Sequence, residues 1–91
     1  MKRLALIFAF VVTAGAAQAA CFADYKAKQD NPLRLHYGVA QVAACSKGGA
    51  RAELGARLAA QGWVLLQVMS VFGNEGLDER KGRAGQFFLR F

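Results

Sequence analysis

Residues 46–72 read SKGGARAELGARLAAQGWVLLQVMSVF, and this stretch decides the fold. In its first half Ala50, Leu54 and Leu58 recur every four residues. That spacing places them on one stripe of an amphipathic helix whose other sides are polar or small. We therefore predict a helix over residues 46–61.

Both ends of this helix carry recognisable signals. Ser46 belongs to the residue types that cap helix N-termini, and Gly62 stands where a left-handed glycine commonly ends a helix. The segment Trp63–Phe72 that follows is almost continuously apolar and lies between glycines. Its length and its content of β-branched and aromatic residues predict a strand.

The segment before the helix predicts another strand. Pro32 disfavours helix at the preceding residue, and residues 33–42 then alternate with a period of two. Such alternation is typical of a half-buried strand. One face would carry Leu33, Leu35, Tyr37 and Val39, and the other Arg34, His36, Gly38 and Ala40. Residues 21–31 are mixed and polar, and we expect a short helical turn or an irregular lead-in there.

The segment after the long strand divides into two parts. Residues 73–84 hold several glycines and charges and predict a long polar loop. Residues 86–91 alternate again and predict a terminal strand paired antiparallel with residues 63–72. The expected fold is a small α+β domain, strand–helix–strand–strand, with one helix packed on a three-stranded sheet. The position of the last strand, between the other two or at an edge, stays open.

This order of motifs resembles a family of small uncharacterised bacterial domains. The resemblance rests on Tyr37-Gly38-Val39, the leucine-containing helix, the segment from Gly62-Trp63 through Val64-Leu65-Leu66-Gln67-Val68, and the terminal aromatic strand. It covers residues 37–91 and departs at Val64, where the family commonly has an acidic residue. The resemblance implies the strand–helix–strand–strand fold and brings no catalytic residues with it.

The N-terminus has the layout of a secretory signal peptide. Lys2 and Arg3 precede a short apolar run, and the small-x-small pattern of residues 17–19 follows it. The run is too short for a stable membrane-spanning helix, and no later segment is long enough. We therefore predict a signal peptide over residues 1–19 and one exported domain over residues 20–91, located in a bacterial periplasm or the medium.

The two cysteines of the exported part predict a disulfide. Cys21 and Cys45 would enter an oxidising compartment, where small domains commonly rely on such crosslinks. An alternative is lipidation of Cys21, as in bacterial lipoproteins. We disfavour it because Gln18 stands where those proteins usually have leucine, and because Cys45 would lose its partner.

The charge of the chain is mildly basic. Lys2 and Arg3 supply two of its six net positive charges, which leaves +4 on the predicted domain. This bias favours anionic surfaces, but the basic residues do not form a run interleaved with aromatics, and we expect no nucleic-acid partner. The candidate anion-binding residues, for a polymer or lipid headgroups, are Arg80, Lys81, Arg83 and Arg90.

The sequence offers little for catalysis. His36 is the only histidine, and no second histidine or closely spaced cysteine pair accompanies it as a metal ligand. Ser46 and Ser70 are the serines, and Ser70 falls inside an apolar strand. We therefore expect neither an enzyme nor a metal or other cofactor, and we interpret His36 as an ordinary surface or half-buried residue.

One apolar face predicts binding. A single helix covers one side of a sheet, and we expect Val64, Leu66, Val68 and Phe72 to face it. The opposite face would then stay uncovered, unless the lead-in at residues 21–31 folds over it. An uncovered apolar patch on a small domain usually marks an interface. We expect a non-enzymatic domain that binds another protein or itself through Trp63, Leu65, Met69 and Phe88.

Overall fold

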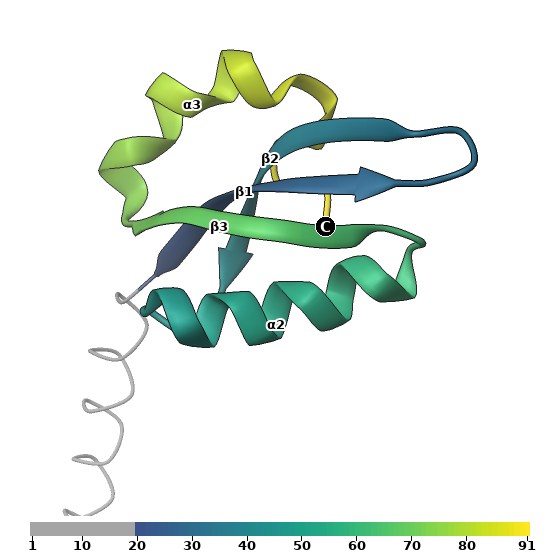
Figure 1. Cartoon of the computed structure of the whole chain (residues 1–91). Coiled ribbons are helices and arrows are strands. Elements are labelled where there is room, and N and C mark those ends of the chain that lie inside the picture. The colour runs from purple at the N-terminus through teal and green to yellow at the C-terminus, as the bar shows by residue number, and fades with distance from the viewer. Residues whose placement is uncertain (1–19) are drawn as a thin grey trace, which may run out of the picture.

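The computed structural model describes residues 20–91; the predicted signal peptide, residues 1–19, lies outside the described part. Three strands form one antiparallel sheet, β1 (Cys21–Gln29), β2 (Arg34–Val42) and β3 (Val64–Phe72). Their order is β2-β1-β3, so β1, the first strand of residues 20–91, lies in the centre (Figure 1). The predicted α+β class and three-stranded sheet are confirmed.

Helix α2 (Lys47–Ala60) covers one face of the sheet, below it in Figure 1. The predicted N-cap and terminating glycine lie at the two ends of this helix. The Ser46 side chain accepts a hydrogen bond from the Gly49 amide, and Gly62 follows the helix with a φ of +84°. The predicted stripe is fully buried, and the core on this side holds Ala23, Tyr25, Ala27, Ala40, Val42, Ala50, Leu54, Leu58 and Val68.

A second helix, α3 (Leu77–Ala84), lies on the opposite face of the sheet. A 3₁₀ turn at Asn74–Gly76 leads into it and another at Gly85–Phe87 follows it. Under α3 lies a smaller core of Phe22, Val39 and Ala84, against which Tyr37, Phe72, Leu77 and Phe88 pack. The expectation of one covering helix was therefore wrong.

The predicted lead-in is the central strand, which corrects the expected chain order. Elements run strand–strand–helix–strand–helix. The pattern of β1 escapes prediction because its inward-facing positions include two alanines, which are poor strand formers. Those alanines, Ala23 and Ala27, are fully buried and leave room for α2 and for the ring of Tyr25.

The C-terminal segment also differs from the prediction. Residues 73–84 are largely helical rather than a loop. The first turn of α3 is acidic and its last turn basic, which complements the helix dipole. The expected terminal strand is absent from residues 86–91, since Leu89 has a φ of +57° that interrupts extended backbone. A single parallel bridge joins Phe88 to Val39, and the Leu89 amide donates to the Val39 oxygen at 2.7 Å.

Two register shifts in the β1–β3 pairing change which side chains of β3 face α2. Pairing skips from Ser70 to Val68 and from Gln67 to Leu65, so that Met69 and Leu66 lack a partner on β1. Each bulge breaks the two-residue alternation. As a result Leu65, Val68 and Val71 pack on the α2 side, instead of the predicted set with Val64 and Leu66.

The predicted disulfide is present and joins Cys21, at the start of β1, to Cys45, just before α2. It therefore ties the central strand to the beginning of the helix that covers it. Within residues 20–91, no helix has the length and hydropathy that crossing a membrane requires.

Candidate functional site

The exposed apolar side chains of the sheet gather at the end where β1 turns into β2. Leu35 and Val64 are cross-strand neighbours of Lys28, one on each side of it. Their side chains remain exposed, 66% for Leu35 and 51% for Val64, and Leu66 is 44% exposed. Together Leu35, Val64 and Leu66 form what we call the hairpin-end patch. Helix α3 covers only the other end of this face, where Phe22 and Phe72 pair.

The hairpin-end patch contains a hollow of about 290 Å³. Its floor is β1, and its walls come from the two outer strands. The lining residues are Lys26, Ala27, Leu35, His36, Tyr37 and Leu66. Lys26 is exposed, and it has no carboxylate within ion-pair distance among residues 20–91. The hollow is thus an apolar depression with a free cation at its edge, large enough for one apolar side chain.

The four residues predicted to form a binding face do not share one. Trp63 and Leu65 pack against the core on the α2 side, whereas Phe88 packs against the core under α3. Met69 is half-buried at a bulge. The predicted binding face was therefore wrong. The two bulges in β3 break the alternation of its side chains between the two sides of the sheet.

The four predicted anion-binding residues are largely engaged within the domain. The Arg80 guanidinium lies 3.9 Å from the Phe72 ring centroid and pairs with Asp24, and Arg83 stacks 4.7 Å above Tyr37. Lys81 lies over Phe88 at 5.8 Å. Arg90 lies near two phenylalanine rings of the C-terminal tail and makes no ion pair within residues 20–91. The structure therefore does not bring the four cations together as one free basic surface.

Asp24 forms a buried polar cluster that sequence reasoning missed. It accepts hydrogen bonds from Ser70 Oγ at 2.6 Å, Tyr37 Oη at 2.8 Å and Arg80 Nε at 3.0 Å. Burial alone would raise the pKa of Asp24. The hydrogen bonds from Ser70, Tyr37 and Arg80 and the charge of Arg80 outweigh burial and hold that pKa below its ordinary value.

The groups of the Asp24 cluster are engaged with one another and link α3 to the sheet. A carboxylate that accepts three donors is satisfied, and it is not free to act as a general base. Burial and the neighbouring Asp24 carboxylate raise the pKa of Tyr37 to about 12, so the phenol stays a donor. Ser70 is bonded to this acid rather than to a histidine, so the cluster has the chemistry of a structural link between α3 and the sheet.

His36 lies in an aromatic cluster instead of on a polar surface. It is 8% exposed, its Nε2 lies 2.9 Å from Tyr25 Oη, and its ring stacks on Phe87 at 3.8 Å. Trp63 meets it edge-on at 4.4 Å and Phe91 lies at 5.7 Å. Burial, and secondarily the charge of Arg90, lower the pKa of His36 below its ordinary value. The ring is therefore a neutral core group, and residues 20–91 hold no cluster of metal-ligand side chains.

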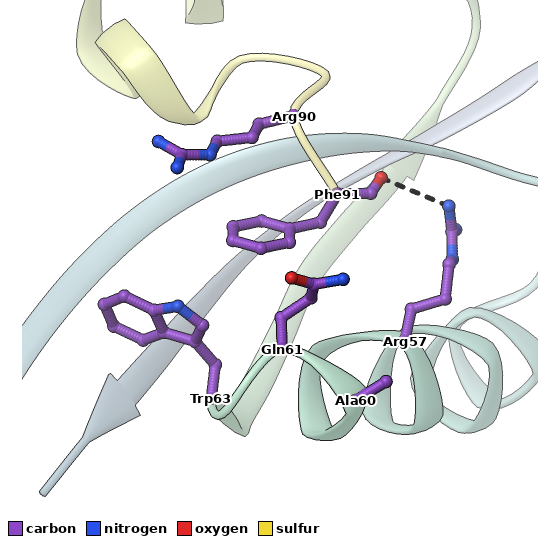
Figure 2. A pocket seen from close by; sticks show the side chains of 6 residues that line it. All are labelled: Arg57, Ala60, Gln61, Trp63, Arg90 and Phe91. Atoms are coloured by element: carbon purple, nitrogen blue, oxygen red, sulfur yellow. Dashed lines mark hydrogen bonds between the residues drawn. The ribbon is translucent and has the colours of Figure 1, made fainter.

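Next to this cluster a second pocket opens between the last turn of α2 and the C-terminal tail. Its volume is about 440 Å³. Figure 2 shows the side chains that line it, with the indole of Trp63 and the ring of Phe91 on one side and Arg57 on the other. Arg57 donates to the backbone oxygen of Phe91 at 3.2 Å and of Gln41 at 2.7 Å. The bond to Phe91 attaches the tail to the helix, and the bond to Gln41 attaches the helix to β2.

Comparison of the chain with protein-family models, with curated proteins and with solved structures gives no match. The family resemblance noted from the motifs at residues 37–91 therefore stays a prediction.

Proposed function

We propose that this domain is exported and that it is a non-enzymatic protein-binding module. Its occupant would be an acidic segment of a partner protein that inserts one apolar side chain into the hollow of the hairpin-end patch. The observation that carries this proposal is the coincidence of exposed Leu35 and Leu66 with the free cation of Lys26 around one depression. Export is supported by the disulfide between Cys21 and Cys45 and by the layout of residues 1–19.

The positive charge around the hairpin-end patch favours an acidic partner over a second copy of this domain. Lys26 and Lys28 lie side by side with the apolar residues, and Lys28 is only partly neutralised by Asp30 at 3.2 Å. A second copy docked through the same surface about a two-fold axis would bring these lysines together, which disfavours self-association here. Acidic residues flanking an apolar anchor would instead meet complementary charge.

The shape of the patch favours a protein over a lipid surface. A hollow receives a single inserted side chain, as in peptide-binding grooves, whereas membrane-inserting surfaces project their apolar residues outward. The second candidate function, binding of anionic polymer or headgroups through Arg80, Lys81, Arg83 and Arg90, has less support because most of these cations contact groups of the domain itself.

The test is selection of peptides from an unbiased displayed library on the purified chain. We expect the enriched peptides to carry one apolar residue flanked by Asp or Glu. Filling the hollow buries most of a leucine-sized side chain, worth about 1.5–3 kcal/mol before association costs are subtracted. Leu66→Ser or Leu35→Ser should therefore weaken binding of those peptides at least tenfold.

Leu89→Ser is the matched control, because Leu89 is as exposed as Leu66 (45%) and lies in the C-terminal tail. It should leave peptide binding unchanged. Enriched peptides without acidic residues, or equal losses in the Leu66 and Leu89 variants, would contradict the proposal. Binding to anionic vesicles that Arg83→Gln abolishes would favour the second candidate instead.

A further inference from the structure

The pocket between α2 and the C-terminal tail has the composition of a small-molecule site. Its volume of about 440 Å³ falls in the range of pockets that hold small ligands. It differs in lining from the hairpin-end hollow, with which it shares no residue. The lining combines two guanidinium groups, two aromatic rings and an amide, and consists of Arg57, Ala60, Gln61, Trp63, Arg90 and Phe91.

The guanidinium groups of this pocket have unused donors. Arg90 makes one long hydrogen bond, 3.5 Å to Gln86 Oε1, and no carboxylate of residues 20–91 pairs with it. Arg57 donates through its two Nη atoms and pairs with Glu53 at 3.3 Å, but its Nε is buried and has no hydrogen-bond partner among the described residues. A buried donor without a partner is costly, and a polar ligand atom that accepts a hydrogen bond from Arg57 Nε would reduce that cost.

The aromatic side of the pocket offers a surface for a ring. Trp63 and Phe91 are both half-buried, and Figure 2 shows their rings next to one another with the Gln61 amide beside them. A flat ligand can stack on such rings while the amide of Gln61 donates to or accepts from its polar edge. The carbonyl end of α2 disfavours negative charge directly above it, so an anionic group belongs on the side of Arg90.

We propose that this pocket binds a small molecule in which a carboxylate is attached to a ring. The ring stacks against Trp63 and Phe91, and the carboxylate accepts a charge-assisted, forked pair of hydrogen bonds from Arg90. Aromatic acids and the ring-form sugar acids share this chemistry. These two ligand classes differ in whether the ring carries hydroxyl groups that can form hydrogen bonds with Gln61.

The single tryptophan provides a direct readout, because Trp63 gives one indole N–H signal in the ¹H–¹⁵N spectrum of the purified full chain. We expect phenylacetate or glucuronate to shift this signal saturably. The neutral analogue phenylacetamide should bind at least tenfold more weakly than phenylacetate. Tighter binding of phenylacetate assigns the site to aromatic acids, and tighter binding of glucuronate assigns it to sugar acids.

Two variants separate a specific site from general attraction of anions. Arg90→Gln should weaken binding of the preferred acid at least tenfold, whereas Arg51→Gln, an exposed arginine of α2 outside this pocket, should change it less than twofold. Equal losses in the two variants, equal binding of phenylacetate and phenylacetamide, or no saturable shift with either acid would overturn the proposal.

Discussion

At the residue scale, buried Asp24 is the polar group that organises one side of the molecule. Three donors from three different elements converge on it, namely Tyr37 of β2, Ser70 of β3 and Arg80 of α3. An acid that is 3% exposed would be destabilising without such partners. The cluster therefore links α3 to all three strands through one ion pair and its hydrogen bonds, in addition to the apolar contacts under the helix.

The first prediction concerns that ion pair. Arg80→Gln should lower the free energy of unfolding by about 3 kcal/mol, because it leaves a buried carboxylate without its counter-charge. Arg83→Gln, which removes the same charge from an exposed position on the same helix, should cost below about 1 kcal/mol. Chemical denaturation measures both, and similar losses in the two variants would show that Asp24 does not depend on Arg80.

The second prediction concerns His36. Its pKa is lowered in the folded state by burial and by Arg90, so the unfolded chain binds more protons just below pH 6.5. The contribution of neutral His36 is therefore fully present above about pH 6.5 and is lost as the pH falls toward the folded pKa. Melting temperatures should fall between pH 7.5 and pH 5, and His36→Gln should flatten this dependence. An unchanged slope in the variant would refute it, since Asp24 titrates below this range.

At the element scale, helices and strands that carry local sequence signals could be predicted. Those whose formation depends on contacts with residues distant in sequence could not. Helix α2 and strands β2 and β3 were predictable from their periodicity, the Ser46 cap and Gly62. Strand β1 was not, because alanine at positions 23 and 27 signals close packing only once α2 is known to lie over them. Helix α3 offers few apolar residues, and Asp24, which holds it through Arg80, is distant in sequence.

The same limit applies to the site. The sequence indicates an uncovered apolar surface, but its members could not be assigned. The bulges at Leu66 and Met69 change which side of the sheet the β3 side chains face, and no local sequence signal indicates these bulges. The hollow of the hairpin-end patch also requires Leu35 and Leu66 to stand on opposite sides of β1. That neighbourhood follows from the β2-β1-β3 order, which depends on the unpredicted central strand.

The third prediction concerns the link between two elements. Reduction of Cys21–Cys45 should destabilise the domain by roughly 3 kcal/mol in the chain-entropy model. For a domain of this size that loss lowers the Tm by roughly 12–24 °C. Calorimetry with and without reductant measures it, with alkylation to verify that both thiols are free. A Tm that does not change after complete reduction would show that β1 and α2 hold together without the crosslink.

At the scale of the whole molecule, the domain presents two different surfaces from one small scaffold. The hairpin-end patch lies on the sheet face that α3 leaves partly open, and the tail pocket lies beside α2. The C-terminal tail contributes to this division because it crosses the β2 edge at Val39, and Phe87 and Phe91 reach His36. The β3 edge has no such cover among residues 20–91.

Binding of an acidic segment with one apolar anchor is tested most directly by an NMR titration of the labelled chain with a synthetic peptide, Glu-Glu-Leu-Glu-Glu. We expect saturable shifts confined to the hairpin-end patch, at residues 26–28, 35–37 and 64–67. Replacing the peptide leucine with serine, or raising the salt concentration, should weaken them. Shifts centred on residues 80–90, shifts that do not depend on the leucine, or no saturable shifts would contradict the proposed function.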